Sequence, residues 1–243
     1  MNTGLIRIAA VLALLILTVS ITGCMYPDER RGENNPAAAK EFLVVVQNAV
    51  NEYQKETGLL PIQNSTMDTP LYEKYVVAFK LLQNRGFLSS IPANAFERGG
   101  TNYYIVINEE TNPEVKLMDL VSYQQAEAVQ KAVDDYRGTH GGVLPAASEA
   151  AKSFYWIDYK LLGTDPPKVV SVYTGQTLSL MMHETGRVVI DYAPDLMQLV
   201  QKQKIQPMQG KDMRALLAES FPHAPAKSYP YFWTQKEPRV SAK

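Results

Sequence analysis

The chain reads AVNEY at residues 49–53 and GLLP at 58–61, and a second copy of this pattern reads AVDDY at 132–136 and GGVLP at 141–145. Two more matches follow in the same order: KLL at 80–82 and 160–162, and Glu-Thr at 110–111 and 184–185. The offsets between the partners shrink slowly, as 83, 84, 80 and 74 residues. Matches that keep one order at similar offsets predict an internal duplication that yields two similar units.

Each copy is expected to open with an amphipathic helix, because apolar residues recur at intervals of three and four, as along one helical face. This face holds Phe42, Val45, Val46, Ala49, Val50 and Tyr53 in the first copy and Ala126, Val129, Val133 and Tyr136 in the second. Gly58 and Gly141 then favour a helix end, and Pro61 and Pro145 prevent the helix from resuming.

Each copy is expected to close with an antiparallel hairpin. Its strands are predicted at 103–107 and 115–117 in the first copy, and at 177–182 and 188–192 in the second. The stretches between helix and hairpin, 63–101 and 146–176, are predicted to be irregular apart from short helices near 75–82 and 154–162. The predicted fold class is therefore α+β.

These elements divide the chain into five predicted parts: a leader at 1–23, a flexible tether at 24–36, the first unit at 37–121, the second at 122–194, and an extension at 195–243. The extension is expected to be mostly irregular, with two short helices before a Pro- and aromatic-rich tail. The tether is charged and nearly free of aliphatic residues, and about twelve such residues reach roughly 20 Å.

The first 24 residues predict where the protein resides. Arg7 precedes an apolar run from Ile8 to Val19, and Thr22 and Gly23 lead to Cys24, the single cysteine of the chain. The run is shorter than the roughly 20 apolar residues of a membrane-spanning helix, and its length suits a signal peptide. The segment resembles the lipobox of bacterial lipoproteins, whose cysteine takes a diacylglycerol and becomes the mature N-terminus. The alternatives are an uncleaved anchor or an ordinary signal peptide with a chance cysteine.

Two further resemblances concern the body. The order Tyr53, Gly58, Pro61, Leu81-Leu82, Gly86-Phe87-Leu88, Ile91-Pro92 and Gly99-Gly100 is similar to the globular half of type II secretion pseudopilins. A filament role is not expected, because pseudopilins carry an early glutamate and this chain has no acidic residue before Asp28. The whole chain resembles uncharacterised lipoproteins of Gram-positive spore-forming bacteria, which share a Cys-Met-Tyr-Pro mature start, here at 24–27. That resemblance implies a location and no activity.

Composition and motifs indicate no catalytic chemistry. The 24 basic and 25 acidic residues nearly balance, which gives no reason to expect a nucleic-acid partner. His140, His183 and His223 are too widely separated for a zinc site. The pairs Glu109-Glu110 and Asp134-Asp135 suit a solvated turn and a solvated helix face. We therefore expect no enzyme activity, no metal and no cofactor.

The aromatic tail is the one candidate contact surface. Tyr229, Tyr231, Phe232 and Trp233 gather near the C-terminus, and tyrosine and tryptophan offer large amphipathic contact areas. They are predicted as possible partner contacts, here with an envelope protein or a wall polymer. The alternative is that the tail folds back and covers the core.

The sequence thus predicts a lipoprotein anchored through Cys24 at the extracytoplasmic face of the cell membrane. Its predicted role is that of a non-enzymatic protein-interaction or assembly module. Two alternatives are a solute-binding lipoprotein of a transporter and a protein that binds or modifies a cell-wall polymer.

Overall fold

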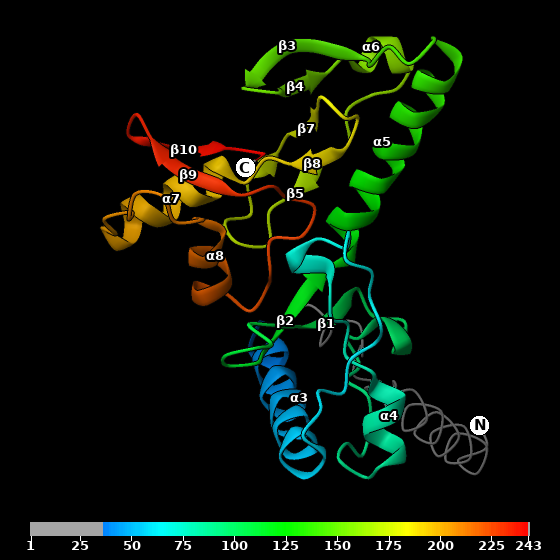
Figure 1. The fold of residues 1–243 in the computed structure, drawn as a ribbon, viewed down its shortest axis with the longest axis vertical. Helices are drawn as coiled ribbons and strands as arrows, with labels where there is room; N and C mark the ends of the chain where they lie inside the picture. The colour runs from blue at the N-terminus through cyan, green and yellow to red at the C-terminus, as the bar shows by residue number, and fades with distance from the viewer. Residues whose placement is uncertain (1–35, 243) are drawn as a thin grey trace, which may run out of the picture.

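The computed structural model describes residues 36–242, so the predicted leader, the lipidation site Cys24 and nearly all of the tether lie outside the described residues. The fold is α+β, as predicted. The α-helices are α3 (Pro36–Thr57), α4 (Phe79–Asn84), α5 (Leu120–Thr139), α6 (Tyr159–Leu162), α7 (Ala193–Gln203) and α8 (Arg214–Ser220), and two 3-10 turns are η1 (Leu71–Glu73) and η2 (Phe96–Arg98). The strands are β1 (Asn102–Ile107), β2 (Glu114–Asp119), β3 (Ala146–Ala151), β4 (Phe154–Ile157), β5 (Val169–Val170), β6 (Thr177–Leu178), β7 (Leu180–His183), β8 (Val188–Ile190), β9 (Tyr231–Thr234) and β10 (Glu237–Val240). Two lobes are visible in Figure 1, and α5 runs up from the first into the second.

The first lobe packs α3 against the antiparallel β1–β2 hairpin, which confirms the predicted helix and hairpin. Val46, Ala49, Val50 and Tyr53 are buried as predicted. The predicted burial of Val45 is wrong, because its side chain is 52% exposed. A hairpin of two strands covers only a narrow stripe of a helix, and Val45 lies at the edge of that stripe.

The second lobe is built on an antiparallel sheet with the strand order β3-β4-β7-β8. The predicted β7–β8 hairpin is confirmed, and Ala126, Val129 and Val133 of α5 belong to the core beside it. The predicted irregularity of residues 146–176 is wrong, because this stretch supplies β3 and β4. Residues 154–157 pair with β3 on one side and with β7 on the other. This pairing fixes the apolar run as a strand and leaves only Tyr159–Leu162 helical.

The C-terminal extension is more regular than predicted. The two predicted short helices are present as α7 and α8, and the β9–β10 hairpin was not predicted. Figure 1 shows this group on the side of the sheet that faces away from α5. The hairpin turn consists of Gln235 and Lys236, with φ angles of 54° and 66°. Turns with two positive φ angles are usually signalled by asparagine or glycine, so this turn has no sequence signature.

Two glutamines make the same contact at equivalent places in the two lobes. The Gln47 side chain on α3 donates to the Pro113 carbonyl at 3.0 Å and accepts from the Val115 N–H at 2.7 Å. The Gln130 side chain on α5 donates to the Gly186 carbonyl at 3.0 Å and accepts from the Val188 N–H at 2.7 Å. Each clamp ties a helix to the second strand of its hairpin. The duplication itself stays a prediction, and these paired contacts agree with it.

Replacing either glutamine by alanine is expected to lower the free energy of unfolding by about 1–3 kcal/mol, because a buried N–H loses its acceptor. Val115 and Val188 are both buried, so Gln47→Ala and Gln130→Ala should have similar effects in urea unfolding. Gln124→Ala is the matched control, since Gln124 lies exposed on α5 and should change stability by less than about 0.5 kcal/mol. A loss confined to one glutamine would show that the clamps are not equivalent.

The segment that joins α8 to β9 straps the two lobes together. The Leu117 N–H of β2 donates to the Pro222 carbonyl at 2.9 Å, and Ala224 N–H donates back to the Leu117 carbonyl at 2.8 Å. Farther along, the Ile190 N–H of β8 donates to the Lys227 carbonyl at 2.8 Å. The outer edges of β2 and β8 are both covered in this way, and the Lys227 N–H also donates to Glu73 of the first lobe at 2.9 Å.

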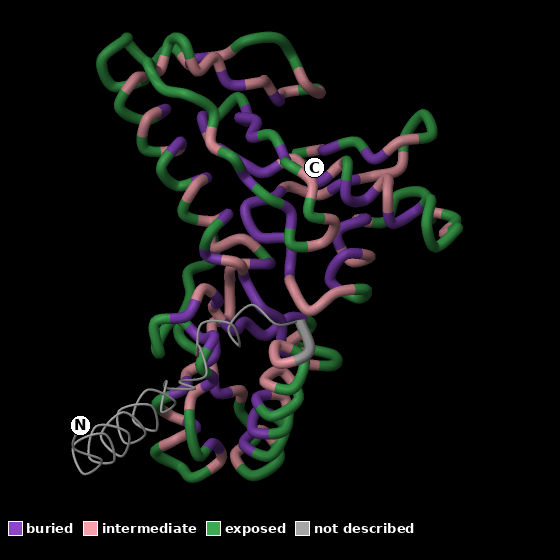
Figure 2. The backbone as a smooth tube through the Cα atoms, turned by 180° about the vertical axis from the view of Figure 1, so that it is seen from behind, coloured by how far each residue is buried: buried purple, intermediate pink, exposed green. Residues whose placement is uncertain are grey.

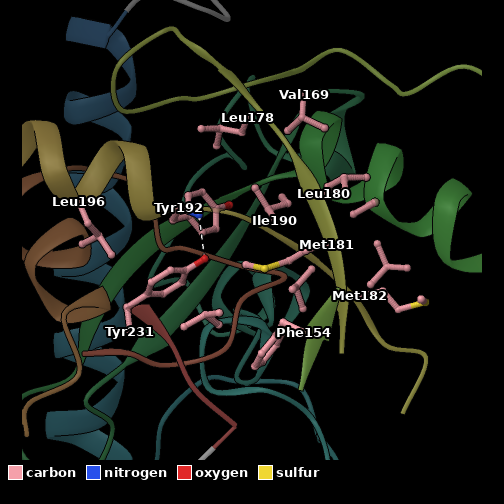
Figure 3. Packing of buried hydrophobic residues seen from close by; sticks show 14 of the residues in the cluster. Phe154, Val169, Leu178, Leu180, Met181, Met182, Ile190, Tyr192, Leu196 and Tyr231 are labelled. Atoms are coloured by element: carbon pink, nitrogen blue, oxygen red, sulfur yellow. Dashed lines mark hydrogen bonds between the residues drawn. The ribbon is translucent and has the colours of Figure 1, made fainter. Parts of the chain in front are cut away.

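The largest buried cluster lies in the second lobe, and Figure 3 labels Phe154, Met181, Ile190 and Tyr231 among its members. Buried backbone follows the strands of both lobes in Figure 2, whereas the loop tips are exposed. Among residues 36–242, the helices are all too short or too polar to cross a membrane.

Candidate partner-binding groove

A groove of about 170 Å³ opens between the sheet of the second lobe and the C-terminal hairpin. Residues from six segments line it: Ala150 and Ala151 of β3, Trp156 of β4, Met181 of β7, Asp191 and Ala193 at the junction of β8 and α7, Tyr231 of β9, and Glu237, Pro238, Arg239 and Val240 of β10. Most of these side chains are apolar, and the charged ones are Asp191, Glu237 and Arg239.

Asp191 is the polar group at the base of the groove. It follows β8 directly, and its Oδ1 accepts from the Ala193 N–H and from the Tyr231 hydroxyl, each at 3.0 Å. Burial raises the pKa of Asp191, and the charge of Asp195 adds to the increase, while the bonds from Ala193 and Tyr231 lower the pKa. The groove therefore holds a carboxyl group whose charge is poorly stabilised by its surroundings.

Tyr231 fixes the position of that carboxyl group. Its hydroxyl donates to Asp191 and accepts from the Tyr192 N–H at 3.0 Å, the contact drawn as a dashed line in Figure 3. Burial raises the pKa of Tyr231 well above its ordinary value, and the nearby Asp191 charge raises it further. The phenol consequently keeps the proton that it donates to Asp191.

The walls of the groove are apolar and its rim is charged. Trp156 pairs across the sheet with Met181, and Pro238 and Val240 are buried in the opposite strand. Glu237 and Arg239 form an ion pair with each other. Arg239 thus has its own anionic partner at the rim.

Strand β3 flanks the groove and forms an open edge of the sheet. It pairs with β4 alone, and its register shifts twice, between Ala146 and Glu149 and between Glu149 and Ala151. Residues 147–149 are exposed. Such irregularities commonly protect an edge from pairing with other strands. Strand β3 is therefore expected to border the groove and not to pair with a strand of a partner.

The four predicted tail residues occupy different places. Tyr231 is only 1% exposed and lines the groove from within the core. This burial agrees with the alternative that the tail folds back onto the core, and the contact of the tail with a partner stays a prediction. Tyr229 packs against Phe154 and His183 with ring centroids 5.1 Å apart in both cases, and the Arg187 guanidinium lies 5.2 Å from its ring. Phe232 and Trp233 are half-buried outside the groove lining.

The histidines lie far apart in structural settings. His183 is buried beside Phe154 and Tyr229, its Nδ1 lies 2.9 Å from the Thr185 hydroxyl, and burial lowers its pKa. His140 stacks on Tyr136, and His223 Nε2 lies 3.3 Å from Asn102 Oδ1. Within residues 36–242, no group of three or more His, Cys, Asp or Glu side chains is arranged to hold a metal ion.

A second buried carboxylate holds a loop in place. Asp195 Oδ1 accepts from the Ser171 hydroxyl at 2.8 Å, the Thr174 hydroxyl at 2.5 Å and the Gln176 amide at 3.2 Å. These donors all lie between β5 and β6, so Asp195 fastens that connection to the first turn of α7.

Asp191 and Trp156 were not predicted as site residues. Asp191 is one of many acidic residues that end a strand, and Trp156 lies in an apolar run that is read equally well as core. They come together only because the chain brings β4, β8 and β10 into one lobe.

The fold and groove define a two-lobed α+β protein with a single-residue-sized groove in its second lobe. Residues 39–119 match the family model of the YphF family N-terminal domain. This segment corresponds to the first lobe, from α3 to β2, and does not include the groove. No curated protein and no solved structure matches the chain.

Proposed function

We propose that this chain is a lipid-anchored envelope protein that binds a partner protein through the groove of its second lobe, without catalysing a reaction. Anchoring rests on the sequence around Cys24, which resembles a lipobox. Binding rests on the groove, and above all on its size.

The volume of the groove favours a partner protein over a free solute. Sites for small molecules commonly enclose about 300–1,000 Å³, whereas this groove holds about 170 Å³. A cavity of about 150 Å³ accommodates one benzene molecule. The groove can therefore take a single side chain, as the pockets that receive anchor residues at protein interfaces do.

Site-specific photocrosslinking tests this function. A benzoylphenylalanine at Ser148, an exposed position two residues before the groove residue Ala150, should give one defined protein adduct in living cells. The same amino acid at Glu52, exposed on α3 in the other lobe, should not give that adduct. The captured protein is identified by mass spectrometry and its binding is reproduced with purified components.

Two results would contradict the proposal. The first is an identical adduct pattern from Ser148 and Glu52, which would indicate unselective contact. The second is a rise in melting temperature with a small solute in a thermal-shift screen, since a ligand that binds the folded state raises its stability. That result would favour the transporter alternative.

A further inference from the structure

We infer that the anchor side chain received by the groove is basic, an arginine or a lysine of the partner, and that Asp191 is the group that pairs with it. This inference rests on the proposed function and adds the chemistry of the partner. It is argued from the charge, the shape and the hydrogen bonding of the groove.

The first argument is an unpaired negative charge. No Lys, Arg or His nitrogen among residues 36–242 lies within 4.0 Å of the Asp191 carboxylate in the ion pairs of the structure. The charges that line the groove are Asp191, Glu237 and Arg239, and the last two neutralise each other as a pair. One added cation would balance the charge that remains.

The second argument is the free oxygen of the same carboxylate. Both protein donors bond Oδ1, so Oδ2 has no donor from the described residues. Oδ2 is also not among the fully buried atoms without a partner, so it keeps some exposure to solvent, and Asp191 lines the groove. An N–H of a guanidinium or an ammonium can reach this oxygen and form a charge-assisted hydrogen bond.

The third argument is the shape of the approach. Trp156, Met181, Pro238 and Val240 form apolar walls along which the methylene stem of a long basic side chain can lie. Trp156 also offers an aromatic ring, which attracts a cation placed over its face. The groove thus matches a side chain with an apolar stem and a charged tip.

The energetics of Asp191 agree with a binding role. Its raised pKa means that the folded protein binds this proton more tightly than the unfolded chain. The free energy of unfolding therefore falls as the pH rises from the ordinary aspartate pKa through the raised one. Ionised Asp191 costs stability at neutral pH, and such groups gather at functional sites.

The test compares two small probes that differ only in charge. N-acetyl-arginine-methylamide carries the cation, and N-acetyl-citrulline-methylamide has nearly the same shape without it. Isothermal titration of the detergent-solubilised full-length protein should show millimolar binding of the arginine probe, and at least tenfold weaker binding of the citrulline probe.

Asp191→Asn should reduce binding of the arginine probe at least tenfold. The asparagine Oδ1 can still accept from Ala193 and Tyr231, so this variant should fold and melt at or above the wild-type temperature. Asp135→Asn makes the same change of net charge on an exposed face of α5 and should leave binding unchanged.

Equal binding of both probes, or unchanged binding by Asp191→Asn, would overturn the inference of a basic anchor. A specific adduct at Ser148 together with either result would leave the proposed function intact. If Ser148 gave no specific adduct but the arginine probe still bound selectively, the proposal of a protein partner would be wrong. The groove would then be a binding site for a cation.

Discussion

Replacing Gly100 with alanine should lower the free energy of unfolding by about 3 kcal/mol or more, at the upper end of what overpacking costs. A Cβ atom at this position would lie 2.2 Å from the Asn94 carbonyl carbon and 2.3 Å from its oxygen. These are backbone atoms, so no side-chain rotation can relieve the contact.

The surrounding hydrogen bonds prevent the backbone from moving away. The Gly100 N–H donates to the Ala95 carbonyl at 2.9 Å, and the Asn94 carbonyl accepts from the Asn102 N–H at 3.1 Å. The Asn94 side chain accepts from the Tyr104 hydroxyl at 2.6 Å within the core of the first lobe. A shift of Asn94 would therefore disturb the start of β1.

Urea unfolding of a soluble version that begins after Cys24 measures this effect. Gly138→Ala is the matched control, because Gly138 lies in α5 and a Cβ there meets no atom within 4 Å. Alanine at a helical position free of clashes should raise stability by up to about 1 kcal/mol. Equal midpoints for Gly100→Ala and wild type would show that the close approach to Asn94 is not present in solution.

The two long helices and the two central hairpins could be predicted from the sequence, because their signals are local. Val46, Ala49 and Val50 repeat at helical spacing, and burial of that stripe against a hairpin is what the structure shows. The spacing of apolar residues likewise predicted α5 and the β7–β8 hairpin. Periodicity predicts an element well when one face of it meets a core.

The strands that were missed depend on pairing between distant segments. The run FYWI at 154–157 is apolar without alternation, and such a run fits a buried helix or a buried strand equally well. Its pairing with β7, where Tyr155 lies opposite Met182, settles the choice. The β9–β10 hairpin was missed for a different reason, since Gln235 and Lys236 adopt positive φ without a glycine or asparagine.

The groove could not be predicted, because its parts lie far apart in the chain. Ala150 and Val240 line the same groove and are separated by 90 residues. Of the residues that the sequence brought forward, only Tyr231 lines it, and it does so as a buried support for Asp191. The aromatic residues of the tail indicated packing against the core. The tail returns to the core because the carbonyls of Pro222 and Lys227 accept backbone hydrogen bonds from β2 and β8.

Replacing Cys24 with alanine should move most of the protein from the membrane fraction to the soluble fraction. A single fatty chain gives only marginal membrane binding, and stable anchoring needs two lipid signals. The proposed diacylglycerol supplies both through one sulfur atom, and each buried methylene contributes about 0.8 kcal/mol. Loss of the sulfur removes both chains together, so the membrane-bound share should fall by about tenfold or more.

Fractionation, immunoblotting and palmitate labelling measure this change. Thr22→Ala is the matched control, because it keeps a small residue before the cysteine and should remain labelled and membrane-bound. The soluble Cys24→Ala protein should melt at the wild-type temperature, since the substitution lies outside residues 36–242, where the two lobes are formed. Wild-type levels of Cys24→Ala in the membrane, or a free thiol at position 24 by mass spectrometry of the purified protein, would refute lipid anchoring.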